Sequence, residues 1–119
     1  MKLKSNQKIS ISCDGGAASG KTTGAKLISK KYNLHFLSSG LLYRYVSYLL
    51  LNYEPKNRID FIKKKFKNLN YKKLSKISLH TQKINSSVSI IAKEKKIRNI
   101  LKKYQLKFAK KYKRICIEG

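Results

Sequence analysis

The sequence has 119 residues, enough for one domain with a hydrophobic core. Apolar residues make up 41% of it and recur in periodic blocks, which excludes a disordered chain. The formal net charge of +24 is extreme, but the basic residues are nearly all Lys and are scattered along the sequence. Because they form no Arg-rich block, we interpret them as solvated surface positions rather than as a dedicated nucleic-acid site.

The sequence contains nothing that resembles a signal peptide or a membrane span. Its first residues are polar, and the longest apolar stretch, around residues 46–51, is too short to cross a bilayer. Cys13 and Cys116 each lie inside an apolar run, and their spacing fits no metal motif. We therefore expect a cytoplasmic protein with no membrane partner and with both cysteines buried.

The first half of the chain predicts a strand, a loop, a helix, a second strand and a second helix. Residues 8–14 alternate in polarity and are rich in β-branched side chains, which is typical of a strand. A glycine-rich turn at 15–20, a helical pattern over 21–32 and a short strand at 34–38 follow. A helix then opens at Ser39, and Glu54 and Pro55 are expected to end it.

The second half predicts several helices and a final strand. Apolar spacing indicates a helix around Ile59 to Phe66, a short one over 69–77, and further helices over 81–92 and 95–111. Residues 114–118 are typical of a buried strand. This order favours a single α/β domain with a parallel sheet and helical crossovers. Because a parallel strand is normally covered on both faces, and no helix follows the last one, we expect an incomplete chain.

A phosphate-binding motif lies between the first predicted strand and helix. Gly15 to Thr22 fit the pattern G-x-x-x-x-G-K-[ST], whose glycines let backbone N–H groups point at phosphate oxygens. Lys21 is expected to reach the β- and γ-phosphates as the catalytic cation, and Thr22 to place its hydroxyl on Mg²⁺. The predicted ATP-binding residues are Gly15, Gly16, Ala17, Ala18, Ser19, Gly20, Lys21, Thr22 and Thr23.

A second candidate group follows the second predicted strand. Ser39 is suited to cap the next helix, which also carries Arg44. Since ligands of open α/β sheets bind at the carboxyl ends of the strands, both residues are expected near bound phosphates. Arginine suits bidentate phosphate contacts and occurs at only four positions, which singles out Arg44 and Arg98. From these residues alone, a structural interpretation fits as well as a phosphate site: Ser39 would be a plain helix cap and Arg44 a surface residue.

Three blocks together resemble the bacterial cytidylate kinases, a family of nucleoside monophosphate kinases. Asp14 to Thr23 are similar to the family's D-G-P-x-[AG]-x-G-K-[SG]-T loop, and Leu37 to Arg44 are similar to its L-D-[ST]-G-x-x-Y-R segment. Val88 to Ala92 followed by Arg98 are similar to V-S-x-[VI]-A-x(5)-R, and Glu118-Gly119 to the start of [DE]-G-R-D. The first block is shared by many families, whereas the others are specific.

The resemblance implies transfer of the ATP γ-phosphate to CMP or dCMP. It also implies a P-loop fold of three α/β/α layers, cut off after the third core strand, with a helical monophosphate-binding insert at about residues 55–94. Its partners would be ATP, Mg²⁺ and small nucleotides, with no specific nucleic acid, and a monomer is expected. Ser89 would hydrogen-bond the cytosine. By matched position, the acceptor-binding residues are Ser39, Arg44, Ser89, Arg98 and Glu118.

The sequence also departs from the family pattern. Gly16 stands where the family usually has Pro, and Ser38 where it usually has Asp. The segment 55–81 is shorter and richer in lysine. The Arg-Asp of the last motif, the family's arginine-bearing lid and its later acceptor-binding residues are absent from this sequence, so we expect this piece alone to turn over little. Two other functions stay open: a basic nucleic-acid-binding module with a vestigial P-loop, and another small P-loop kinase. Ser89 and Arg98 disfavour the latter.

Overall fold

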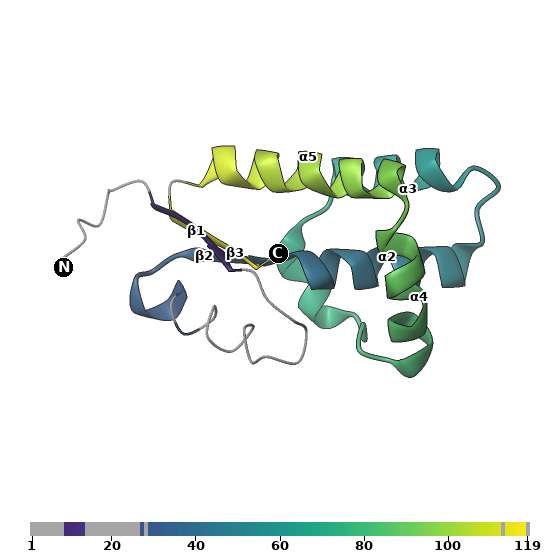
Figure 1. Cartoon of the computed structure of the whole chain (residues 1–119), viewed down its shortest axis with the longest axis horizontal. Coiled ribbons are helices and arrows are strands. Elements are labelled where there is room, and N and C mark those ends of the chain that lie inside the picture. Colours follow the sequence, from purple (N-terminus) through teal and green to yellow (C-terminus); the bar gives the residue numbers. More distant parts are fainter. Residues whose placement is uncertain (1–8, 14–26, 28, 113, 119) are drawn as a thin grey trace. The chain divides into compact units, whose positions relative to one another are not determined.

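The computed structural model describes residues 9–13, 27, 29–112 and 114–118, which form a mostly helical α/β arrangement (Figure 1). The predicted phosphate-binding residues lie outside the described residues, as does most of the helix predicted over 21–32, of which residues 27 and 29–31 are helical. The elements in chain order are β1 (Ile9–Cys13), β2 (His35–Ser38), α2 (Ser39–Tyr53), α3 (Arg58–Lys67), the 3₁₀ helix η1 (Tyr71–Lys76), α4 (Gln82–Ala92), α5 (Lys95–Lys111) and β3 (Arg114–Glu118).

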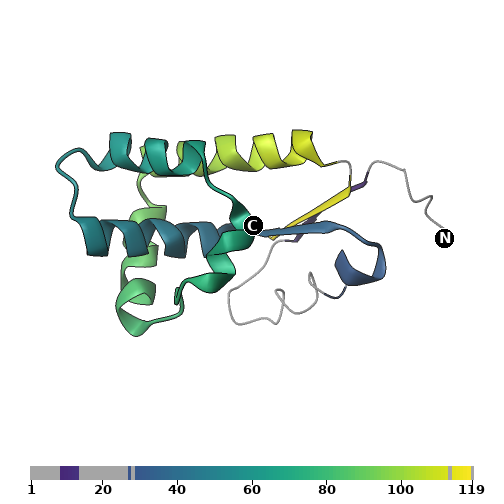
Figure 2. The same ribbon diagram turned by 180° about the vertical axis from the view of Figure 1, so that it is seen from behind.

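These elements agree in type with the sequence predictions, with one refinement. The bounds predicted for α5 and β3 are those observed, and the reverse side of the ribbon shows β2 leading directly into α2 (Figure 2). The short helix predicted over 69–77 is a 3₁₀ helix. Glu54 adopts the left-handed conformation, with φ 42°, directly after α2. Pro55 hinders a right-handed helical conformation at the preceding residue, which explains why α2 ends there.

The chain divides into two compact units. Unit 1 consists of Met1–Ser39 and Gln105–Gly119, and unit 2 of Gly40–Tyr104. The boundaries therefore fall at the start of α2 and within α5. The helical insert expected at 55–94 falls within the sequence of unit 2. Among the described residues, no helix has the length and apolar content that a bilayer crossing needs.

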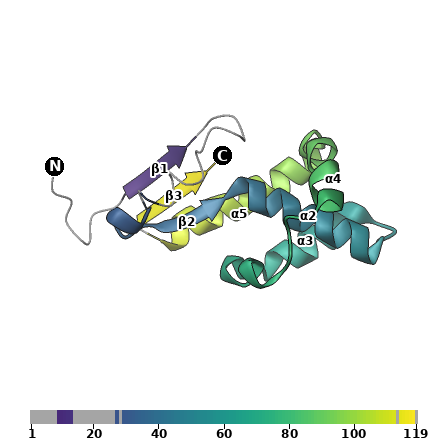
Figure 3. The ribbon, with the colours of Figure 1, turned by 90° about the horizontal axis from the view of Figure 1, so that it is seen from below.

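Unit 1 contains a three-stranded parallel sheet, which confirms the predicted parallel arrangement. The strand order is β1-β3-β2, so the last strand of the chain lies in the middle and pairs with both others (Figure 3). Leu37, Ile115 and Cys116 are buried, with Leu37 and Cys116 fully inaccessible to solvent. The expectation that Cys116 is buried is therefore confirmed, whereas the side chain of Cys13 lies outside what the structure describes.

A tight turn sets the start of β2. Asn33 has φ 56°, a left-handed conformation that asparagine adopts at lower cost than most residues. The Leu34 amide donates to the Ser29 carbonyl across 2.7 Å, which closes the end of the preceding helical turn. Arg114 at the start of β3 donates hydrogen bonds to the carbonyls of Tyr32 and Asn33. The turn is thus tied to the neighbouring central strand.

Unit 2 is a helical unit with its own apolar core. The buried stripe of α2 includes Leu42, Val46 and Leu49, at the spacing predicted for one helix face. An edge-on contact between the rings of Phe66 on α3 and Tyr104 on α5 joins two further helices, with centroids 5.7 Å apart. The other buried apolar residues of this unit are Ile62, Leu74, Leu79, Ile84, Ile91, Ile97, Ile100 and Leu101.

Candidate functional site

The carboxyl ends of the three strands meet at one edge of the sheet in unit 1. In the strand register, Glu118 of β3 lies opposite both Cys13 of β1 and Ser38 of β2. The predicted phosphate-binding loop follows Cys13 in the chain, and α2 begins directly after Ser38. Ligands of open parallel sheets bind at this kind of edge. The sheet therefore directs the start of the predicted loop to the edge where its chemistry is expected.

Polar side chains at this edge are withdrawn from solvent. Ser38, Ser39 and Glu118 are all buried, although serine and glutamate usually lie at the surface. The Ser39 Oγ accepts a hydrogen bond from the side-chain Nε2 of Gln105 on α5. Ser39 and Glu118, two of the predicted acceptor-binding residues, both belong to unit 1. Glu118 ends the central strand, and its side chain is buried there rather than exposed at the surface.

In unit 2, Arg44 of α2 is held by a residue of α4. Its Nε donates to the Asn85 Oδ1 across 3.0 Å. Close by in sequence, the buried Ser47 hydroxyl donates to the Ile84 carbonyl, also across 3.0 Å. Two side-chain hydrogen bonds therefore tie α2 to the first half of α4. The Arg44 guanidinium keeps a defined place on the helix pair although the residue is only half-buried.

Arg98 of α5 interacts with the residue next to Arg44. Burial raises the pKa of the Tyr43 phenol above its ordinary value, and the Arg98 guanidinium acts in the opposite direction through its positive charge. Tyr43 is therefore an uncharged hydroxyl at neutral pH and lies within electrostatic reach of Arg98. The charge of Arg98 on α5 thus acts on Tyr43, and the adjacent Arg44 is hydrogen-bonded to Asn85 on α4.

Ser89 is exposed on α4, one helical turn beyond Asn85. Residues four apart share a helix face, so Ser89 lies on the side of α4 that contacts Arg44. Sequence reasoning missed Asn85 and gave Tyr43 no role of its own. The signal for Tyr43 was its place inside the second motif, whereas no local pattern distinguishes Asn85.

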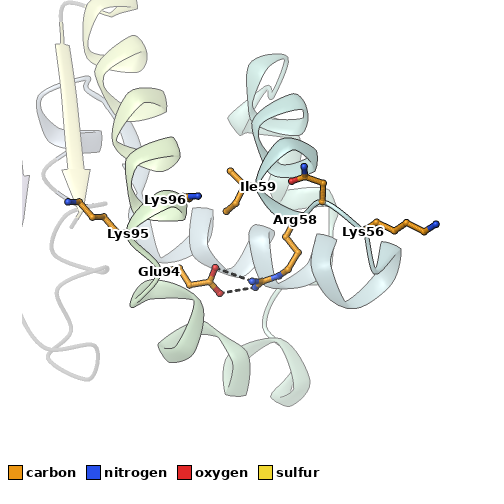
Figure 4. A pocket seen from close by; sticks show the side chains of 7 residues that line it. Lys56, Arg58, Ile59, Glu94, Lys95 and Lys96 are labelled. Atoms are coloured by element: carbon orange, nitrogen blue, oxygen red, sulfur yellow. Dashed lines mark hydrogen bonds and ion pairs between the residues drawn. The ribbon is translucent and has the colours of Figure 1, made fainter.

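A separate open cavity of about 460 Å³ lies in unit 2. The Arg58 guanidinium and the Glu94 carboxylate form a bidentate ion pair in it, and Lys56 and Lys95 extend away from this pair (Figure 4). None of the predicted site residues lines this cavity; its lining residues are Lys56, Asn57, Arg58, Ile59, Glu94, Lys95 and Lys96. We therefore keep it apart from the candidate site.

Comparison with known protein families identifies the family of this chain. The sequence model described as cytidylate kinase matches residues 11–119. The chain belongs to the cytidylate kinase family. It is 37% identical over 114 residues to the cytidylate kinase of Bartonella tribocorum, covering 92% of this chain and 51% of that protein. The cytidylate kinase of Rickettsia felis is 33% identical over 115 residues, covering 96% and 52%. The chain thus spans about half the length of these curated relatives.

Membership of the cytidylate kinase family implies a P-loop fold, ATP and nucleotide binding. The described part of the sheet fits this, because β1 is parallel to its neighbour and leads into the motif at the carboxyl edge. Mg²⁺ is a different matter. Within the described ranges, no group of three or more His, Cys, Asp or Glu side chains is placed to hold a metal ion. The predicted metal-contacting residue, Thr22, lies outside those ranges, and its role stays a prediction.

Proposed function

We propose that this chain carries nucleotide-binding parts of an ATP-dependent kinase that converts CMP or dCMP to the diphosphate. The observation that carries the proposal is the placement of two arginines in unit 2. Arg44 is held by Asn85, and the charge of Arg98 acts on the phenol of Tyr43, the residue next to Arg44. In the described part of the chain, neither guanidinium forms an ion pair with a carboxylate. Their positive charge is therefore open to an anionic ligand.

The acceptor side of this proposal assigns one task to each group. Arg44 and Arg98 would bind the phosphate of the acceptor nucleotide, since guanidinium groups match phosphate oxygens in geometry and charge. Ser89, whose hydroxyl is on the exposed side of α4, would hydrogen-bond the cytosine. Ser39 and Glu118 belong to the same proposed acceptor set, on the evidence of the family motif positions.

The donor side rests on the motif that follows β1. Backbone N–H groups of Gly15 to Thr23 would surround the ATP phosphates, and Lys21 would neutralise charge on the γ-phosphoryl group. Mg²⁺, held through Thr22, would supply further positive charge to the β- and γ-phosphates. In the reaction, an oxygen of the CMP phosphate forms a bond to the γ-phosphorus, the bond to the β,γ-bridging oxygen breaks, and ADP leaves. The residues would act by positioning and charge stabilisation.

The finer architecture is part of the same proposal. A three-layer α/β/α P-loop domain would contain the described sheet, and residues 55–94 would form the helical insert that binds the monophosphate. The family also favours a monomer that works in the cytoplasm with small nucleotides as its partners. Size-exclusion chromatography with light scattering tests the monomer, and a dimer at micromolar concentration would contradict it.

The function is tested by nucleotide binding and by ADP release. We expect the chain to bind CMP or dCMP at least about tenfold more tightly than AMP or GMP, a difference of about 1.4 kcal/mol. Lys21→Ala should weaken ATP binding and leave CMP binding unchanged, because only the donor side loses a charge. Isothermal titration calorimetry measures both affinities, and a coupled assay follows ADP release with each acceptor. A preference for AMP or GMP would overturn the assignment.

One observation favours the second candidate, a nucleic-acid-binding module. Eight of the 17 residues of α5 are Lys or Arg and none is acidic. The described structure places most of these side chains at the surface. This module predicts tight, salt-sensitive RNA or DNA binding that survives Lys21→Ala, whereas the kinase predicts only weak and nonspecific binding. Electrophoretic mobility shifts at two salt concentrations, with and without the substitution, separate the two.

A further inference from the structure

The contact between Arg44 and Asn85 lies on a rigid part of unit 2. The Ser47 side chain is fully buried, and its hydroxyl donates to the carbonyl of Ile84, the residue next to Asn85. Val46 of α2 and Ile84 of α4 are both buried in the core. The helix backbones that carry Arg44 and Asn85 are therefore fixed before any ligand binds. The side-chain bond of 3.0 Å is added to that fixed frame.

This bond uses one particular donor of the guanidinium. A guanidinium has five N–H donors in a planar fork, and Asn85 accepts the one on Nε. Of the four remaining donors, one N–H of each Nη group points along the outer edge of the plane, away from Nε. That edge matches two oxygens of a phosphate or carboxylate. Holding Nε therefore fixes the plane of the guanidinium and leaves its bidentate edge available.

An uncharged acceptor is the right partner for such a task. The carboxamide oxygen of Asn85 accepts a hydrogen bond without cancelling the charge of Arg44. A carboxylate in the same place would form an ion pair and compete with an incoming phosphate. In the described part of the chain, Arg44 forms no ion pair. The chain thus combines a fixed orientation with an uncompensated positive charge.

We propose that Asn85 is a positioning residue, which holds Arg44 so that both Nη groups face the acceptor phosphate. The proposal rests on the function proposed above and adds a residue to it. Because the arginine is ordered on folding, less side-chain freedom is lost when the phosphate binds. Ser89 lies one turn further along the same face of α4. One helix face would then position the phosphate contact and supply the base contact.

The orientation of Arg44 can be observed without nucleotide. The Arg44 Nε–H resonance in a ¹H–¹⁵N NMR spectrum, assigned by its loss in Arg44→Lys, should be sharp and slow to exchange with water. Asn85→Ala should broaden it or make it exchange faster. The matched control is Ser86→Ala, which alters the neighbouring exposed residue, whose hydroxyl donates only to the Lys83 carbonyl. Ser86→Ala should leave the Arg44 signal unchanged.

Affinity then tests what the orientation is for. Asn85→Ala should weaken CMP binding by about three- to tenfold, the effect expected from one lost hydrogen bond. Cytidine lacks the phosphate, so its affinity should not change. In an Arg44→Lys background, Asn85→Ala should have no further effect, because lysine has no Nε–H bond to lose. Asn85→Asp should keep the resonance sharp and still weaken CMP binding, because its charge neutralises the guanidinium.

The outcomes separate this proposal from the function on which it rests. If the unmodified chain binds no CMP, the proposed function fails and the positioning role fails with it. If the chain binds CMP and Asn85→Ala changes neither the resonance nor the affinity, only the positioning role is wrong. Equal losses for CMP and cytidine would instead make Asn85 a base contact or a structural residue, and would also overturn the proposal. Thermal unfolding of each variant confirms that it is folded.

Discussion

Arg58, the first residue of α3, and Glu94, which directly precedes α5, form a bidentate ion pair across 36 residues of sequence. The Nη2–Oε1 distance is 2.8 Å and the Nη1–Oε2 distance is 3.1 Å. Glu94 has a second favourable contact, because its charge lies at the positive N-terminal end of α5. The first turn of α5 has no acidic residue of its own. Glu94 therefore stabilises the fold through both the ion pair and the helix end, whereas Arg58 does so through the ion pair alone.

We predict that Glu94→Gln destabilises the chain more than Arg58→Gln does. The pair is partly exposed, so breaking it should cost about 0.5–1 kcal/mol, and losing the charge at the helix end about 0.3–1 kcal/mol more. Urea unfolding followed by circular dichroism measures both variants, and high salt should reduce their difference. Lys56→Gln, at a cavity residue that extends away from the pair, is the matched control. Equal losses for the two variants would contradict the helix-end contribution.

A second prediction compares two leucines on α5. Leu101 is 1% exposed, whereas Leu106 is 62% exposed. Leu101→Ala should lower the free energy of unfolding by about 2–5 kcal/mol, because it removes buried apolar contacts and leaves a cavity. Leu106→Ala makes the same change on the same helix at the surface and should stay within about 0.5 kcal/mol. Denaturant unfolding measures both, and similar losses would mean that the buried face of α5 is wrongly assigned.

A third prediction concerns alkaline pH. The pKa of Tyr43 is raised by burial, so the folded state disfavours the phenolate relative to the unfolded state, whose tyrosines titrate near about pH 10. The stability linked to Tyr43 is therefore complete below that pH and is lost as pH rises through the folded-state pKa. Tyr43→Phe should reduce the loss of stability between about pH 9 and pH 11. Urea midpoints of both proteins measure this, and parallel curves would refute it.

A fourth prediction concerns the basic surface of α5. Because the basic residues of α5 are spread over exposed positions of the helix, binding to a single-stranded polyanion should be weak and should fall steeply with salt. Replacing Lys110 and Lys111, which lie at the end of the helix, by Gln should lower the slope of log K against log salt by at most about 1.4. Fluorescence anisotropy with labelled poly(dT) measures the slope. Tight binding at physiological salt would instead favour the nucleic-acid module.

Much of the local structure could be predicted from the sequence. Helix α5 has apolar residues at helical spacing over its whole length, and β3 is a short apolar run rich in isoleucine, so the period alone set their type and bounds. Pro55 marked the end of α2 for an equally local reason. The type of η1 was less predictable, because a segment of six residues carries too little periodicity to distinguish an α-helix from a 3₁₀ helix.

The candidate site divides in the same way. Arg44 and Arg98 could be named from the sequence, because arginine is suited to bind phosphate and both residues occupy arginine positions of the motifs. Asn85 could not, because its significance depends on a bond to a residue 41 positions away. The buried place of Glu118 likewise depends on β3 lying between two other strands. Neither property is visible in the neighbouring residues of the chain.

The sequence by itself determined the family, the order of the elements and the residue types of a nucleotide site, since these follow from local patterns and short motifs. Only the tertiary structure decided that the last strand lies at the centre of the sheet, that Asn85 holds Arg44, and that the charge of Arg98 acts on Tyr43. The reason is physical. Strand order and side-chain partners depend on which distant segments bury one another's surfaces, and that is determined by packing of the whole chain rather than by the periodicity of any part.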